Sequence, residues 1–125
     1  MKNLIYTAEQ VQRTIVRMAY EIYEHNHTEQ EIVIAGIQSQ GFELANRIGE
    51  ELVAISPIKV KLLSVSIDKA NPFESEVLLD GSDNYDLDNK VLILVDDVLN
   101  SGKTFAFCLK ALLEYNFSKV ETAVL

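Results

Sequence analysis

The sequence predicts an α/β fold: an open, mostly parallel twisted sheet with helices on both faces. Short, continuous apolar runs such as residues 32–37 and 91–95 have the length and composition of strands buried on both faces. Longer segments with apolar residues at helical spacing lie between them. This alternation of strands and helices favours parallel pairing of the strands.

The bulk properties narrow the class of protein. The chain has 125 residues, a formal net charge of −8 and one cysteine. This length suits a single domain over residues 1–125 that buries a real core. An acidic chain without a run of Lys or Arg gives no electrostatic reason to bind RNA. With no disulfide pair, signal peptide or long apolar span in the sequence, we expect a cytoplasmic protein without a membrane segment.

The first helix is predicted to begin after Thr7, which forms a capping box with Gln10. Tyr6 and Val11 have the spacing of a hydrophobic staple, and the helix should end near residues 25–26. A buried stripe at helical spacing is formed by Val11, Ile15, Met18 and Ile22.

The middle of the chain alternates between strands and helices. A strand over residues 32–37 is followed by a loop at residues 38–41 and a helix marked by apolar residues from 44 to 52. Pro57 then breaks the chain before a strand over residues 58–67. The polar stretch that follows contains a short expected strand near residues 76–79.

The last third begins with the most apolar strand, residues 91–95. A helix over residues 103–115 follows, and Cys108 within it is expected in the core. Residues 120–125 are predicted to form a final buried strand. Because the chain stops inside this strand, we expect a C-terminal portion of the domain to be missing.

Two adjacent acids, Asp96 and Asp97, follow the most apolar strand. Ligands of open α/β sheets bind at the carboxyl ends of strands, and side-chain alternation turns at least one acid toward that crevice. Neither acid is expected in the core. The structural alternative is a solvated strand end or a helix cap.

The next helix opens with Asn100-Ser-Gly-Lys-Thr104. Its free N–H groups, two hydroxyls and helix dipole favour an anion, and Gly102 permits either a positive φ or close approach of a ligand. An N-capped helix with a glycine turn is the alternative. Together with the acids, this segment indicates a phosphorylated sugar as the ligand.

Two other motifs are excluded by spacing. Gly-Lys-Thr resembles the end of a Walker A loop, but that loop needs a glycine five positions before Gly102, where Asp97 stands. An acidic pair after an apolar strand also resembles a receiver domain. Such domains need a phospho-accepting aspartate well downstream of the pair, and too little chain follows here.

Residues 91–104 resemble the motif by which type I phosphoribosyltransferases bind 5-phospho-α-D-ribosyl 1-pyrophosphate (PRPP). The shared pattern is an apolar strand, two acids, a small hydroxyl residue, glycine and threonine. Residues 35–41 are similar to the family's pyrophosphate loop, and residues 63–71 to the start of its flexible active-site loop. The spacing is most similar to bacterial pyrimidine-operon regulators that also act as uracil phosphoribosyltransferases.

The resemblance implies transfer of a phosphoribosyl group from PRPP to a nucleobase, with release of pyrophosphate and with Mg²⁺ as the cofactor. Asp96, Asp97 and Lys69 would be the catalytic residues. The ribose and 5′-phosphate would contact Asp96, Asp97, Val98, Leu99, Asn100, Ser101, Gly102, Lys103 and Thr104. The pyrophosphate would contact Gln38, Ser39, Gln40 and Gly41. No residue is assigned as a direct metal ligand, and homodimers are common in the family.

Several residues depart from the family pattern, among them Ala70 and Asn71, which replace an acidic pair of close relatives. Gln40 stands where relatives commonly carry Arg or Lys, Lys69 where close relatives carry Arg, and Asn100 where purine-specific members often carry Asp. A neutral amide donates hydrogen bonds without charge, and it cannot remove a proton from a base. Two hypotheses therefore stay open: an active phosphoribosyltransferase, or a catalytically weak regulatory or sensor domain that binds PRPP or a nucleotide.

Overall fold

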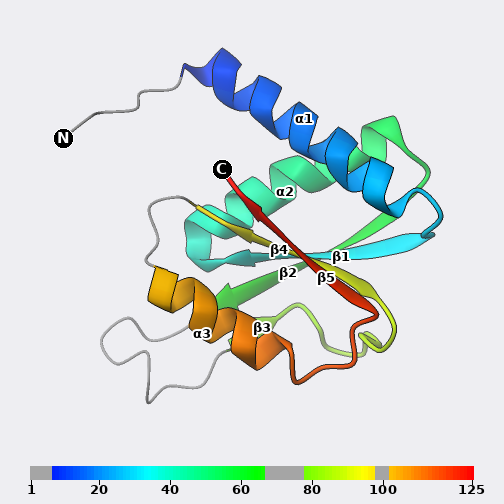
Figure 1. Cartoon of the computed structure of the whole chain (residues 1–125), viewed down its shortest axis with the longest axis vertical. Coiled ribbons are helices and arrows are strands. Elements are labelled where there is room, and N and C mark those ends of the chain that lie inside the picture. The colour runs from blue at the N-terminus through cyan, green and yellow to red at the C-terminus, as the bar shows by residue number, and fades with distance from the viewer. Residues whose placement is uncertain (1–6, 67–77, 98–101) are drawn as a thin grey trace.

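The computed structural model describes residues 7–66, 78–97 and 102–125 (Figure 1). Within these residues the chain forms a five-stranded sheet with three helices. The elements in chain order are α1 (Ala8–Asn26), β1 (Glu31–Ile37), α2 (Gln38–Ile55), β2 (Lys59–Ser66), β3 (Leu78–Asp80), β4 (Val91–Asp96), α3 (Gly102–Leu112) and β5 (Lys119–Val124).

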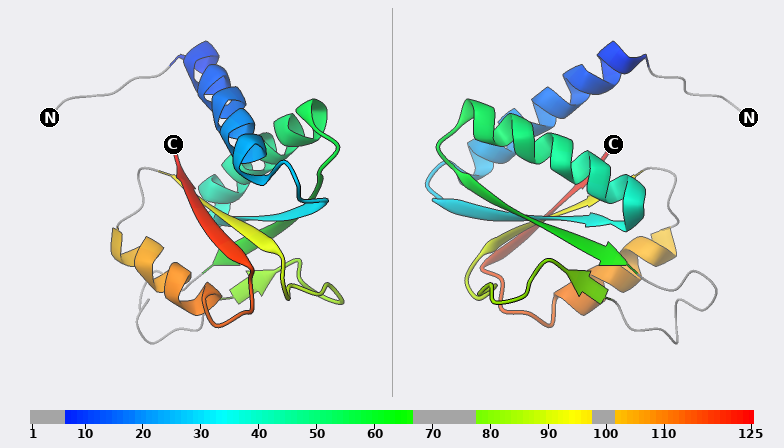
Figure 2. Two further views of the ribbon diagram at one scale, coloured as in Figure 1. Left: turned by 45° about the vertical axis from the view of Figure 1, so that its right-hand side comes forward. Right: turned by 180° about the vertical axis from the view of Figure 1, so that it is seen from behind.

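The strand order is β3-β2-β1-β4-β5, and every neighbouring pair is parallel except β2 with β3. Helices α1 and α2 cover one face of the sheet and α3 covers the other (Figures 1 and 2). The predicted open, mostly parallel sheet with helices on both faces is confirmed. In the described part of the chain, no helix has the length and apolar character needed to cross a membrane.

The capping box at the start of α1 is present. The Thr7 side chain accepts a hydrogen bond from the Gln10 backbone N–H at 3.1 Å, and the Gln10 side chain accepts one from the Thr7 N–H at 2.9 Å. These two bonds satisfy donors that the first helical turn leaves open. The predicted stripe also holds, because Ile15 and Ile22 are buried while Val11 and Met18 pack at the margin of the core. Tyr6, the predicted staple partner, lies outside the described residues.

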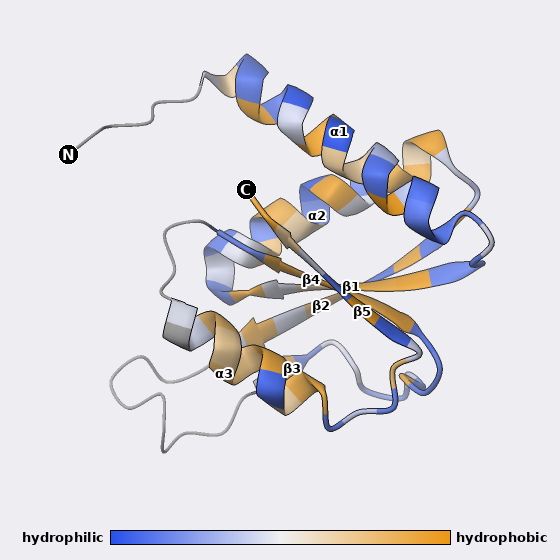
Figure 3. Ribbon diagram, viewed as in Figure 1, coloured by the Kyte–Doolittle hydropathy of each residue, from blue (hydrophilic) through white to orange (hydrophobic). Residues whose placement is uncertain are grey.

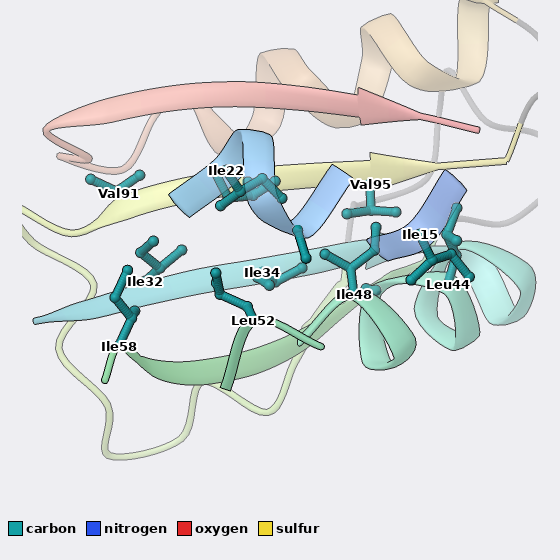
Figure 4. Close-up of a cluster of buried hydrophobic side chains, with 13 residues drawn as sticks. Ile15, Ile22, Ile32, Ile34, Leu44, Ile48, Leu52, Ile58, Val91 and Val95 are labelled. Atoms are coloured by element: carbon teal, nitrogen blue, oxygen red, sulfur yellow. The ribbon is translucent and has the colours of Figure 1, made fainter. Parts of the chain in front are cut away.

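The two central strands, β1 and β4, are buried on both faces. Their alternate side chains enter two cores, one under α1 and α2 (Figure 4) and one under α3. Coloured by hydropathy, both strands are largely orange, and the helices are orange mainly on the sides that face the sheet (Figure 3). Burial on both faces explains why their sequences read as continuous apolar runs.

Two predicted boundaries and one predicted burial are wrong. Residues 38–41, expected as a loop, form the first turn of α2. Helix α3 ends at Leu112 rather than residue 115, because the chain tightens into turns with Glu114 N–H donating to the Ala111 carbonyl at 3.3 Å. Strand β5 was expected to be buried, but it lies at the edge of the sheet and its residues are exposed or half-buried.

A polar network fastens β5 to the end of α1. Glu121 Oε1 accepts hydrogen bonds from the side chains of Asn26 at 2.9 Å and Lys119 at 3.1 Å, and Glu121 Oε2 lies 3.2 Å from His25 Nδ1. Burial raises the pKa of Glu121, but the hydrogen bonds from Asn26, His25 and Lys119 outweigh it. The pKa of Glu121 therefore lies below its ordinary value.

This network predicts a pH-dependent contribution to stability. A carboxylate with a depressed pKa stabilises the fold above its unfolded pKa of about 4.3, and that stability is lost as the pH falls through the folded value. We expect Glu121→Gln to lower the free energy of unfolding at pH 7 by about 1–2 kcal/mol, because charge-assisted bonds are lost. The difference from wild type should shrink below pH 4. Urea titrations at several pH values measure both effects.

The matched control is Glu114→Gln, which removes an exposed carboxylate. We expect a change of under about 0.5 kcal/mol for this variant at every pH. A difference between wild type and Glu121→Gln that persists unchanged at acidic pH would contradict the role assigned to the carboxylate.

Candidate functional site

The site residues predicted from the sequence converge where β1 and β4 end. These strands are parallel neighbours, and Gly36 of β1 is paired with Val95 of β4. The start of α2, which follows β1 directly, therefore lies beside the end of β4 (Figure 2). Both lie at the carboxyl ends of the strands, where open α/β sheets bind their ligands.

Two glycines hold the start of α2 against the sheet. A Cβ on Gly36 would overlap the carbonyl oxygen of Gly41 and the Cα of Phe42. A Cβ on Gly41 would lie 3.1 Å from the carbonyl oxygen of Val95, which belongs to β4. The backbone of α2 thus packs directly on β1 and β4. Gly41 serves this close approach rather than the loop that was expected around it.

The first turn of α2 presents hydrogen-bond donors. Its N-cap residue, Ile37, makes no side-chain cap hydrogen bond, and Gln38 has a φ of 61°, in the left-handed region. The Gln38 side-chain nitrogen is buried and has no hydrogen-bond acceptor in the described part of the chain. An uncapped helix N-terminus with such an amide is suited to bind an anion.

The acidic pair divides between the interior and a pocket. Asp96 is 3% exposed, and its Oδ1 accepts a hydrogen bond from the Asp97 N–H at 2.8 Å. The expectation that neither acid lies in the core is therefore wrong for Asp96, because β4 continues through it and it pairs with Val124 of β5. Asp97 is half-buried and lines a pocket that also contains Gln40.

Cys108 of α3 supports the same strand end from the other side. It is fully buried, as predicted. Burial raises the pKa of the Cys108 thiol to about 11, and the charge of Asp96 adds to the effect. The thiol is therefore protonated at neutral pH and contributes to the core rather than to nucleophilic chemistry.

The predicted phosphate segment is partly described. Gly102 is the first residue of α3, and no heavy atom of the described residues lies within 4 Å of the place where its Cβ would stand. Both reasons suggested for this glycine, a positive φ and close approach of a ligand, stay predictions. Thr104 is half-buried in the first turn of α3. The remaining predicted residues, Lys69, Val98, Leu99, Asn100 and Ser101, and the side chain of Lys103, lie outside the described residues.

Two contributions were missed in the sequence. Gly36 carried a signal, because a glycine inside a buried strand often marks close approach of another backbone. Arg47, two helical turns after Gln40 on the same face of α2, lines the pocket of Asp97. The spacing of the two residues in the sequence shows that they share a helix face. No pattern in the sequence shows that β4 ends beside that face.

The fold and the site together define an open α/β domain with two acids and an uncapped helix N-terminus at the carboxyl ends of its central strands. Comparison with known proteins gives the family. The model of the phosphoribosyl transferase domain matches residues 3–125, so the chain belongs to the phosphoribosyltransferase family. The predicted class of enzyme, a phosphoribosyltransferase that uses PRPP and a nucleobase, is confirmed by this relationship.

Individual proteins similar to this chain support the family assignment. The bifunctional protein PyrR of Clostridium kluyveri is 32% identical over 130 residues, which cover 100% of this chain and 73% of the relative. The PyrR protein of Clostridium acetobutylicum is 35% identical over 131 residues, with 100% and 74% covered. The crystal structure of a purine phosphoribosyltransferase from Pyrococcus horikoshii has a TM-score of 0.69 and 25% identity, and covers 100% of this chain and 78% of its own.

The packing of Gly36 gives a stability prediction. We expect Gly36→Ala to lower the free energy of unfolding by about 1–3 kcal/mol or more, because the new methyl group displaces the start of α2 from β1. The matched control is Gly49→Ala, within α2 itself, where the nearest atom to the new Cβ is the side-chain atom Val60 Cγ1 of β2 at 3.2 Å. That change should be nearly neutral, since alanine favours a helix. Urea unfolding that shows equal effects would contradict the assigned packing.

Proposed function

We propose that PRPP lies along the carboxyl edge of β1 and β4, with its ribose at Asp96 and Asp97. Its pyrophosphate would lie at Gln38, Ser39, Gln40 and Gly41, and its 5′-phosphate at residues 99–104. The observation that carries the proposal is the glycine packing that places the uncapped start of α2 beside the acids of β4. A single ligand with a sugar between two phosphate groups fits an acidic pair flanked by two helix N-termini.

In the proposed reaction, a nucleobase nitrogen attacks the anomeric carbon of the ribose. The C–N bond forms, the C–O bond to pyrophosphate breaks, and the nitrogen loses its proton. The chain contributes by positioning the ribose and by placing negative charge near the developing oxocarbenium-like carbon. Asp97 in its pocket and Asp96 beneath it are the groups that supply this charge. Lys69 is named as a catalytic residue on the family resemblance alone.

Mg²⁺ fits this site as a partner of the substrate. In the described part of the chain, no group of three or more His, Cys, Asp or Glu side chains is arranged to hold a metal. Such a donor set suits an ion bound mainly by phosphate oxygens and water, with few protein ligands. When bound, Mg²⁺ offsets the negative charge of the pyrophosphate. Asp97 is the described carboxylate best placed to contact it or its water.

The proposed base is uracil, because the spacing of the motifs is most similar to the uracil-using regulators, and the similar relatives are PyrR proteins.

The second candidate function, a sensor of PRPP or a nucleotide with little turnover, is favoured by the neutral pyrophosphate loop. Gln38 and Gln40 supply no charge to a leaving group. The net charge of −8 argues against RNA as a partner. We propose the cytoplasm as the location and leave a homodimer as an expectation.

One experiment separates the two functions. Binding of PRPP with Mg²⁺ is measured by calorimetry, and turnover is measured with uracil, hypoxanthine and guanine. Turnover with uracil supports the transferase. Binding with no turnover of any base supports the sensor. The absence of binding would overturn the proposed site.

The acidic pair gives the next prediction. We expect the double variant Asp96→Asn, Asp97→Asn to weaken PRPP binding about ten-fold or more, because charge-assisted hydrogen bonds to the ribose hydroxyls are lost. Asparagine is nearly isosteric with aspartate, so the buried position of residue 96 keeps its shape. Circular dichroism checks the fold and calorimetry measures affinity. A folded double variant with unchanged PRPP affinity would refute the assignment.

Gly102 tests the 5′-phosphate site separately. Inorganic phosphate or uridine monophosphate should raise the melting temperature of the wild type by mass action. Gly102→Val should lose this shift, because its side chain enters the space assigned to the anion. The fold should be kept, since no atom of the described residues lies within 4 Å of the new Cβ. Equal thermal shifts in both proteins would place the anion elsewhere.

A further inference from the structure

The pocket beside Asp97 contains one arginine that the family resemblance did not assign. The pocket has a volume of about 180 Å³ and lies between the starts of α1 and α2 and the ends of β4 and β5. Its polar lining comes from Gln40, Glu43, Arg47 and Asp97. Two of these, Gln40 and Asp97, belong to the proposed pyrophosphate and ribose sites. The pocket therefore adjoins both halves of the proposed ligand.

Arg47 is held in place by a neutral group. Its Nη2 donates to Gln12 Oε1 of α1 at 2.8 Å, and Gln12 Nε2 donates to Glu51 Oε1 at 2.9 Å. Within the described residues, no carboxylate lies within 4.0 Å of the Arg47 guanidinium. A bond to an amide orients the guanidinium without neutralising its charge. Several of its five N–H donors remain to bind a ligand.

The charges around the pocket show what Arg47 adds. Asp97 and Glu43 are acidic, and Gln40 is neutral. Without Arg47, a ligand that carries pyrophosphate would meet two carboxylates and no cation on this lining. Like charges that line one small pocket repel appreciably when they are partly shielded from water. Arg47 offsets this repulsion and provides a planar donor set that matches phosphate oxygens.

We propose that Arg47 is a specificity-determining residue that favours ligands with a pyrophosphate group, supplying the charge that Gln40 lacks. This inference rests on the proposed function, because it takes PRPP as the ligand of the site. It assigns the positive charge to the middle of α2 rather than to its first turn. The resulting selectivity is for PRPP over ribose 5-phosphate, which has no pyrophosphate.

The test compares the two ligands in matched variants. With Mg²⁺ present, Arg47→Gln should weaken PRPP binding about ten-fold, the effect of about 1.4 kcal/mol of lost charge interaction. Its affinity for ribose 5-phosphate should change less than about two-fold. The control is Arg17→Gln, which makes the same change of charge at a side chain that is 69% exposed and paired with Glu21 at 3.6 Å. That variant should bind both ligands as the wild type does.

A rescue variant makes the assignment specific. Adding Gln40→Arg to Arg47→Gln should restore PRPP binding, because it returns a cation to the same pocket. Arg47→Lys is the second variant, for use if Arg47→Gln does not fold. It keeps the positive charge and a side chain able to contact Gln12 of α1. It should retain most of the preference for PRPP.

Three outcomes would overturn the inference. Equal losses for PRPP and ribose 5-phosphate would show that Arg47 does not act on the pyrophosphate. Unchanged PRPP binding in Arg47→Gln, or equal weakening in Arg17→Gln, would show that the effect is absent or nonspecific. A wild-type protein that binds neither ligand would overturn the proposed function itself. That result is distinct, since the other outcomes all require wild-type binding.

Discussion

The candidate site depends on one contact between backbones: the packing of Gly36 in β1 against Gly41 in the first turn of α2. No side chain fits between them, and Gly41 also lies against the carbonyl of Val95 in β4. A larger residue at either position would push the helix away from the strand ends. The acids of β4 and the donors of α2 would then lie too far apart for one ligand. The closeness of the β4 acids to the donors of α2 therefore depends on glycine, with no side chain, at both positions.

The sheet supplies the rigidity that this contact needs. Strands β1 and β4 are buried on both faces and lie parallel, in a register that pairs Gly36 with Val95. Two apolar cores hold this pair, one from each side, and Figure 4 shows the core under α1 and α2. The edge strand β5 lacks such cover and is fixed instead by the Glu121 network with the end of α1. Hydrophobic burial therefore positions the centre of the site, and polar contacts position its border.

The parts predicted from the sequence are those governed by local rules. Apolar runs identified the strands, and Thr7 with Gln10 identified the start of α1, because strand burial and helix capping leave direct marks on residue type. The errors have non-local causes. Gly41 was interpreted as a loop residue, although it is a helical residue shaped by Gly36, and Asp96 was expected outside the core that it enters. Arg47 was overlooked because its proximity to Asp97 depends on how α2 crosses the end of β4.

The net charge of the chain opposes binding of an anion, whereas the groups at the carboxyl ends of β1 and β4 favour it. A chain of net charge −8 repels an anionic ligand at long range, although salt at physiological strength screens such forces beyond about 8 Å. In the proposed complex, the uncapped start of α2, the buried amide of Gln38 and the guanidinium of Arg47 would outweigh the distant charges, because each would contact the ligand directly. The acids of β4 fit the same scheme, since ribose hydroxyls donate to carboxylates. In the proposed complex, recognition would be divided along the carboxyl ends of the strands: carboxylates for the sugar, and helix N-terminus, amides and arginine for the phosphates.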